Sequence, residues 1–158
     1  MKDGLFSNGS LQNVTLPQNL QFIPKESFKR SSQLVSIDIP PTVAFIEASA
    51  FEECHRLNGT LDLSNVKSIA ESAFYNCRSL QYVLLSEQLK TLSAKAFYQC
   101  QSLEHITIPD NVIKIEDSAL RGAPLASVIL SKNIAIIGRD AFSGALPTVN
   151  VVYKGSQE

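Results

Sequence analysis

The sequence predicts a solenoid, in which short repeated units coil around one continuous hydrophobic core and stack along an axis. The segments AFYNCRSLQYVLL (73–85) and AFYQCQSLEHITI (96–108) have nearly the same pattern, 23 residues apart. A leucine opens each unit at steps of 21 to 23 residues: Leu11, Leu34, Leu57, Leu80, Leu103, Leu125 and Leu146. Self-similarity at a fixed period of about 20 to 50 residues is the signature of a repeat architecture. Because one unit cannot bury its apolar face alone, each coil must stack on the next.

The first half of each unit is an expected β-strand. LVSIDIP (34–40) and LEHITIP (103–109) alternate apolar and polar residues, as strands with one buried face do. Pro17, Pro40 and Pro109 then remove an N–H donor and end the strand. Two inward-facing rows are expected: Val14, Ile37, Leu61, Val83, Ile106, Val128 and Val149, then Leu16, Ile39, Leu63, Leu85, Ile108, Leu130 and Val151. Stacking would pair the strands into one parallel sheet.

The third unit, LNGTLDLSNV (57–66), departs from the others. It gains one residue near Gly59 and loses one before Val66, so the period is kept. An additional residue in a strand requires a bulge, and glycine tolerates the backbone conformation that a bulge imposes. We therefore expect a β-bulge at Gly59.

The second half of each unit carries an apolar pair three residues apart and then a short turn. The pairs are Val43/Ile46, Val66/Ile69, Leu89/Leu92, Val112/Ile115 and Ile134/Ile137. The turn places Phe28, Phe51, Phe74, Phe97 and Phe142 in one row, with Leu120 in the fifth unit. Ser or Lys before Ala-Phe suits the start of a brief helical turn, which is too short to be an independent helix. We expect such segments on the side away from the sheet.

Three cysteines occupy one position of the repeat. Cys54, Cys77 and Cys100 are spaced 23 residues apart, and their odd number rules out full pairing within the chain. The close-set ligands of a zinc site, such as C-x₂-C, are absent. A disulfide between neighbouring coils is the alternative. We expect a row of buried free thiols that pack as small apolar groups.

Composition and charge restrict the class of protein. At 158 residues with 44% apolar and 18% charged residues, the chain suits one globular domain. A net charge of −1 argues against a nucleic-acid partner. No run approaches the roughly 18 apolar residues of a membrane-spanning helix, so we expect no membrane insertion. The start MKDGLFSNGS lacks a signal-peptide pattern. Either the protein is cytosolic, or these are mature residues of an exported protein with Met1 added.

No arrangement of side chains indicates catalysis. The two histidines, His55 and His105, are 50 residues apart at different positions of the repeat. The motifs G-x-S-x-G, H-E-x-x-H, G-x-G-x-x-G and the P-loop are absent. We therefore predict that the protein is not an enzyme and needs no metal or cofactor.

The outward face of the expected sheet offers the best candidate site. Its two columns read Asn13, Ser36, Thr60, Tyr82, His105, Ser127, Thr148 and Thr15, Asp38, Asp62, Leu84, Thr107, Ile129, Asn150. Most of these residues are small and polar. The exceptions are Tyr82, Leu84, His105 and Ile129, from three consecutive units, and we predict that they form a binding patch. The alternative is that Tyr, Leu and Ile are there because they favour strands.

The repeated unit resembles the BspA-like leucine-rich repeats, also called the Treponema pallidum type. The pattern C-x-S-L-x-x-I-x-I-P-x-x-V-x-x-I-x-x-x-A-F is best matched by CRSLQYVLLSEQLKTLSAKAFYQC and CQSLEHITIPDNVIKIEDSAL, and the ending TVNVVYKGSQE is similar to that of many such arrays. The family's Ile-Gly pair occurs only at Ile137-Gly138, so the other turns should differ in detail.

The resemblance implies a right-handed leucine-rich-repeat solenoid with a parallel β-sheet on its concave face and short turns, 3-10 or helical segments on its convex side. Residues 1–158 would form a single repeat domain of about six 23-residue repeats plus partial terminal repeats, a fragment of a longer array.

Members of the family are mostly surface or secreted proteins linked to adhesion and host-protein binding. The resemblance thus implies a protein–protein interaction module at the cell surface or secreted, with a protein partner, which includes host matrix or surface proteins. Two alternatives stay open: a structural spacer without a ligand, and a carbohydrate-binding module, for which only Tyr82 offers an aromatic platform. The sequence does not indicate an oligomeric state.

Overall fold

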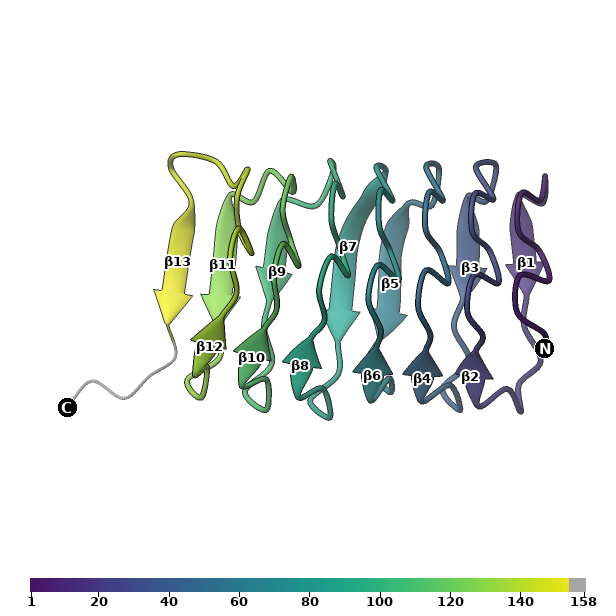
Figure 1. The fold of residues 1–158 in the computed structure, drawn as a ribbon, viewed down its shortest axis with the longest axis horizontal. Helices are drawn as coiled ribbons and strands as arrows, with labels where there is room; N and C mark the ends of the chain where they lie inside the picture. The colour runs from purple at the N-terminus through teal and green to yellow at the C-terminus, as the bar shows by residue number, and fades with distance from the viewer. Residues whose placement is uncertain (154–158) are drawn as a thin grey trace.

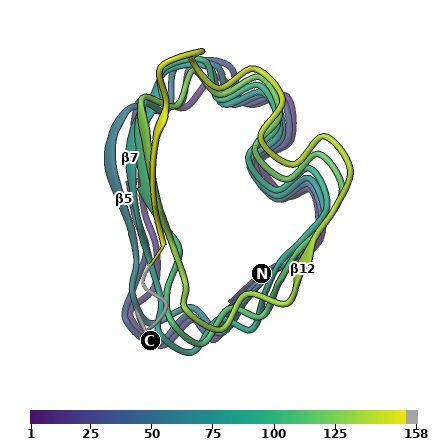
Figure 2. The same cartoon turned by 90° about the vertical axis from the view of Figure 1, so that its left-hand side faces the viewer.

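The computed structural model describes residues 1–153 as a stack of similar coils (Figure 1). Each coil contributes one strand to a first row: β1 (Asn13–Thr15), β3 (Ser36–Asp38), β5 (Gly59–Leu63), β7 (Leu80–Leu85), β9 (His105–Thr107), β11 (Ser127–Leu130) and β13 (Asn150–Tyr153). A second row consists of two-residue strands: β2 (Phe22–Ile23), β4 (Phe45–Ile46), β6 (Ser68–Ile69), β8 (Thr91–Leu92), β10 (Lys114–Ile115) and β12 (Ile136–Ile137). Viewed along the stack, the coils superimpose as one loop, with β5 and β7 on one side and β12 on the other (Figure 2). The predicted solenoid is confirmed.

The strands of the first row pair in parallel, but the ladder of hydrogen bonds is interrupted twice. Pairing joins β1 to β3, β5 to β7, and β9 to β11 and β13. Between β3 and β5 the N–H of Asn58 still donates to the carbonyl of Val35 at 3.1 Å. Between β7 and β9 no backbone hydrogen bond joins residues of the described chain. We call this interruption the β7–β9 seam.

The bulge in the third unit is confirmed. The register between β5 and β7 shifts between Gly59 and Thr60. Gly59 has a φ of 77°, a left-handed conformation that favours glycine. After the shift, Thr60 lies opposite Tyr82 and Asp62 opposite Leu84, so the outward columns continue across the bulge.

The expected helical segments are absent from residues 1–153, and that prediction was wrong. In their place lie turns, which we call the turn ladder: residues 4–8, 26–30, 49–53, 72–76, 95–99, 118–122 and 140–144. The first and last residue of each turn have positive φ, as Ser49 (55°) and Glu53 (61°) do. A left-handed residue ends a right-handed helix, and two of them four residues apart leave no room for one.

Hydrogen bonding explains why the turns are stable without a helix. Alternate N–H groups point in different directions: Phe51 donates to Ala73 of the next coil at 2.8 Å, whereas Glu52 donates to Ser49 of its own coil at 3.1 Å. Stacking therefore satisfies backbone donors that a single turn would leave unpaired. The left-handed conformations cost roughly 1–2 kcal/mol each for residues with a side chain. The bonds between coils offset this cost.

The core runs the length of the stack. The Leu row is fully buried at Leu34, Leu57, Leu80, Leu103 and Leu125. The rings of Phe6, Phe28, Phe51, Phe74 and Phe97 stack in sequence, with centroids 5.1 to 5.3 Å apart. Leu120 continues the row as predicted and is buried, while Phe142 in the last described turn is partly buried. The Phe row thus links successive coils through similar contacts.

The cysteines form the predicted row of buried free thiols. All three are fully buried and unpaired. Each thiol donates to the carbonyl of the Phe 26 residues before it: Cys54 to Phe28 (3.1 Å), Cys77 to Phe51 (3.1 Å) and Cys100 to Phe74 (3.4 Å). Burial raises the pKa of Cys54 and Cys100 to about 12, and raises that of Cys77 well above its ordinary value. The row is therefore made of neutral thiols at physiological pH.

The register predicted for the last strand was wrong by two residues. Ser127 pairs with Asn150 and Ile129 with Val152, not with Thr148 and Asn150. The cause is a tight turn before β13, in which the N–H of Val149 donates to the carbonyl of Leu146 at 2.9 Å. Pro147 occupies the second position of this turn, which its fixed φ favours. Leu146 therefore lies at the start of a turn and not at the start of the strand.

Candidate functional site

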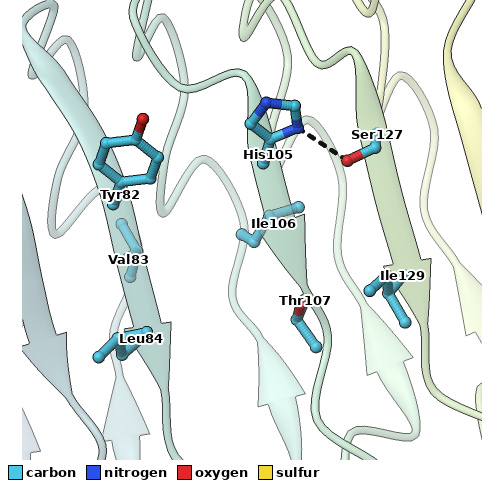
Figure 3. Close-up of a pocket in the computed structure, with 8 residues that line it drawn as sticks. All are labelled: Tyr82, Val83, Leu84, His105, Ile106, Thr107, Ser127 and Ile129. Carbon is cyan, nitrogen blue, oxygen red and sulfur yellow. Dashed lines mark hydrogen bonds between the residues drawn. The ribbon is translucent and has the colours of Figure 1, made fainter.

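The four residues predicted to form a binding patch lie together on the outer face of the first row (Figure 3). Tyr82 and Leu84 come from β7, His105 from β9 and Ile129 from β11. They line a groove of about 240 Å³ together with Val83, Ile106, Thr107 and Ser127. Tyr82 and Leu84 are each 52% exposed, His105 is exposed and Ile129 is half-buried. The structure therefore brings the predicted residues into one concavity.

The groove lies at the β7–β9 seam. Val83 of β7 and Ile106 of β9 belong to the inward-facing row, yet both line the groove. Strands joined by a regular ladder lie about 4.7–4.9 Å apart, so that their backbones cover the side chains of the inward-facing row. Here no backbone hydrogen bond of the described chain draws β7 and β9 together. The apolar floor of the groove therefore lies where the ladder is interrupted.

A side-chain hydrogen bond orients one wall of the groove. His105 Nδ1 lies 2.8 Å from Ser127 Oγ, and the donor in this bond depends on the tautomer of the imidazole ring. The bond holds the ring toward β11 (Figure 3). Because Nδ1 is engaged, Nε2 is the ring nitrogen left to contact a ligand. His105 can therefore offer a polar contact from a fixed position beside the apolar floor.

The strands of the outer face carry exposed acidic side chains but no Lys or Arg. None of the eight residues that line the groove is Asp, Glu, Lys or Arg. The seven strands of the first row contain no Lys or Arg, whereas Asp38 and Asp62 are exposed on them. Hydrogen bonds from Ser64, from its side chain and its backbone N–H, lower the pKa of Asp62 and keep it ionised. This surface is suited to neutral or cationic ligands.

A small polar notch adjoins the groove. It has a volume of about 70 Å³ and is lined by Gln81, Tyr82, Ser102 and Glu104. Tyr82 lines both the notch and the groove, so the two share a wall. The sequence reasoning missed Glu104, which precedes β9 and falls outside the two outward columns. It also missed Ser127 and Thr107 as groove residues, although both stood in those columns.

The second row carries a further exposed aromatic pair that the sequence reasoning missed. Phe22 and Phe45 are partners in the register of β2 and β4, and they are 42% and 49% exposed. A signal was available, because each Phe directly precedes a buried Ile of the same repeat position. None of the described grooves is lined by these two side chains.

The acidic, histidine and cysteine side chains of the described residues do not gather into a metal site. Within residues 1–153, no cluster of three His, Cys, Asp or Glu side chains could hold a metal ion. His55 lies 3.3 Å from Asn76 through its Nε2 and belongs to the turn region, apart from the groove. The same part of the chain contains no helix long and apolar enough to span a membrane.

Comparison with known proteins identifies the type of repeat. The model of the BspA type leucine-rich repeat region matches in six copies, over residues 1–123 and 58–156. None of the curated proteins matches the chain in sequence.

Solved structures of leucine-rich-repeat proteins are similar in fold. A leucine-rich repeat protein from Bacteroides ovatus has a TM-score of 0.81 at 24% identity, over 96% of this chain and 44% of its own. A leucine-rich cell surface protein from Faecalibacterium prausnitzii has a TM-score of 0.52 at 19% identity, over 93% and 61%. The T. pallidum leucine-rich repeat protein has a TM-score of 0.50 at 21% identity, over 94% and 64%. The chain thus spans less than two thirds of each of these proteins.

Proposed function

Because the chain belongs to the family of BspA type leucine-rich repeats, we propose that it is a protein–protein interaction module of a cell-surface or secreted adhesin-like protein. Binding uses the outer face of the first row, the face that the family resemblance expects to be concave. The observation that carries the proposal is the groove, which gathers Tyr82, Leu84, His105 and Ile129 from three consecutive coils.

The chemistry of the groove suits a protein partner. Binding hot spots are enriched in Tyr and cluster around well-packed apolar pockets. The groove has an apolar floor, one Tyr at its wall and a held imidazole, and it has no charged lining residue whose desolvation would oppose binding. The stacked Phe row beneath supports the site from within a continuous core. A partner would therefore meet a surface that needs little reordering on binding.

A similar protein supports the proposed location at the cell surface. One similar structure is that of a cell surface protein from F. prausnitzii. A solenoid at a cell surface presents an extended face to other proteins without moving parts. Sugar recognition is less well served here, because Tyr82 is the one aromatic ring besides the imidazole of His105 among the groove residues.

A binding screen with matched variants tests the proposal. The chain is screened against host matrix proteins, glycans and bacterial surface proteins, alongside Tyr82→Ala/Ile129→Ser and a control, Phe22→Ala/Phe45→Ser, which changes exposed apolar residues of the second row. We expect a protein ligand whose affinity falls by about tenfold or more in the groove variant and is unchanged in the control.

The screen has three contrary outcomes. A ligand lost in the control variant and kept in the groove variant would place binding on the second row. A glycan ligand would favour the carbohydrate-binding module. The absence of any ligand for a chain whose fold is confirmed by circular dichroism would favour a structural spacer.

A further inference from the structure

Resting on the proposed function, we infer that the partner binds with two neighbouring groups: an apolar side chain that enters the groove, and a Lys or Arg side chain that pairs with Glu104 in the adjoining notch. The inference rests on the chemistry of two adjoining hollows and on the distribution of charge over the molecule.

The groove accepts an uncharged, apolar group. Val83 and Ile106 form its floor, and Leu84 and Ile129 contribute aliphatic walls. The groove has a volume of about 240 Å³. At about 30 Å³ per water molecule, this is the volume of roughly eight waters, which is room for one large side chain with some adjoining backbone. An ionised group placed there would lose hydration without finding an opposite charge among the lining residues. An aliphatic or aromatic side chain is therefore the matching occupant.

The notch accepts a cation. Glu104 is exposed, and no described Lys, Arg or His lies within ion-pair distance of its carboxylate. Gln81 and Ser102 offer further polar groups, and the ring of Tyr82 forms the wall shared with the groove. An ammonium or guanidinium group beside Tyr82 would gain both the charge of Glu104 and the face of the aromatic ring.

The distribution of ion pairs differs between the turn ladder and the first row. On the turn ladder, acidic side chains lie beside basic ones of the same chain, as Glu53 does with Arg30 (3.2 Å) and Asp140 with Arg121 (3.0 Å). On the first row, Asp38 and Asp62 have no Lys or Arg among the strand residues to pair with. Glu104, which directly precedes β9, is in none of the ion pairs of the described residues. Acidic groups that are not paired with Lys or Arg attract a basic surface and speed its association.

A peptide selection tests the inference directly. A library of random heptapeptides displayed on phage is selected on the immobilised chain and counter-selected on Tyr82→Ala/Ile129→Ser. We expect enriched peptides to share an apolar residue with a Lys or Arg within three positions of it. Their affinity should fall about threefold to fivefold on Glu104→Gln, the loss of one exposed ion pair, and less at high salt.

Matched controls separate the charge from other effects. Glu71→Gln removes an exposed carboxylate of the turn ladder, which lies 3.9 Å from Lys95, and should leave peptide affinity unchanged. Replacing the basic residue of a selected peptide by Gln should abolish the difference between the wild-type chain and Glu104→Gln.

The outcomes distinguish this inference from the proposed function. Groove-dependent peptides without a basic residue, or with equal affinity for Glu104→Gln, would overturn the inference and leave the interaction module standing. Failure to enrich groove-dependent peptides would also overturn it, while the screen with folded proteins decides the proposed function separately.

Discussion

The turn ladder and the first row of strands repeat with the same period, yet only the turn ladder is uninterrupted. Every turn of the described chain is bonded to the next, and its Phe rings stack at nearly constant distance from Phe6 to Phe97. The first row is broken at the β7–β9 seam, where the candidate groove lies. The comparison indicates that one side of the coil maintains the stack, while the other loses regularity and contains a groove.

The largest expected effect concerns the side of the coil that carries the turn ladder, where ionisation of the Cys row should destabilise the fold at alkaline pH. The pKa of Cys54 and Cys100 is raised from 9.0 to about 12 because burial disfavours the thiolate. Because the pKa is raised in the folded state, the contribution of these neutral thiols to the free energy of unfolding is fully present below about pH 9. This contribution is lost as the pH rises toward 12. The free energy of unfolding should fall by roughly 1.4 kcal/mol per thiol and per pH unit in this window.

Denaturant titrations at pH 8 and pH 10.5 measure this slope. A variant with all three cysteines replaced by Ala supplies the control, because its remaining slope reports the other groups that titrate in the same range. Equal slopes in the two proteins would contradict the assignment of a buried neutral row. So would rapid reaction of the native thiols with a labelling reagent at pH 8.

The next largest effect comes from the Phe row. Phe74 is fully buried between Phe51 and Phe97, with ring centroids 5.1 and 5.3 Å away. Phe74→Ala should lower the free energy of unfolding by about 3–5 kcal/mol, as deletion of a core aromatic does. Phe45→Ala, at a 49% exposed position, is the matched control and should cost less than about 1 kcal/mol. Similar losses in the two variants, measured by urea unfolding, would mean that the Phe row does not maintain the stack.

Much of this architecture could be predicted from the sequence because aligning the repeated units shows which residues occupy the same position in each coil. The bulge at Gly59 was predictable, since an insertion in one unit is visible against its neighbours and glycine permits the left-handed backbone. The shared face of the four residues was predictable for the same reason, because the register of one strand indicates which residues of β7, β9 and β11 point outward. The four residues of that site do line one groove.

Other features carry no comparable signal in a single sequence. The left-handed positions of the turn ladder are occupied by residues such as Ser72 and Lys95, which do not favour that conformation, and bonds from the neighbouring coil stabilise it. The register of β13 was mispredicted because Leu146 has the spacing of a strand residue but lies in a turn with Pro147. The seam depends on how two strands approach each other, which neither strand specifies alone.

A smaller effect is expected at Gly59, in the bulge of the first row of strands. Nothing lies within 4 Å of a Cβ added at this position, and its φ is 77°. Gly59→Ala should therefore cost about 1–2 kcal/mol through backbone conformation alone, without a steric clash. Gly59→Asn, a residue that tolerates the left-handed region better, should recover part of the loss. Equal losses for Ala and Asn in thermal or urea unfolding would show that the bulge does not require the left-handed conformation.

The smallest expected effect is at the groove itself. Tyr82 and Leu84 are each 52% exposed and lie where the ladder between β7 and β9 is absent. Tyr82→Ala and Leu84→Ser should change the free energy of unfolding by less than about 0.5 kcal/mol each, as exposed substitutions usually do. If both variants keep this stability in urea unfolding while partner affinity falls, the groove is separable from the forces that hold the stack together. A loss above about 2 kcal/mol would instead mean that these side chains close the seam, and that their place on the outer face reflects strand packing.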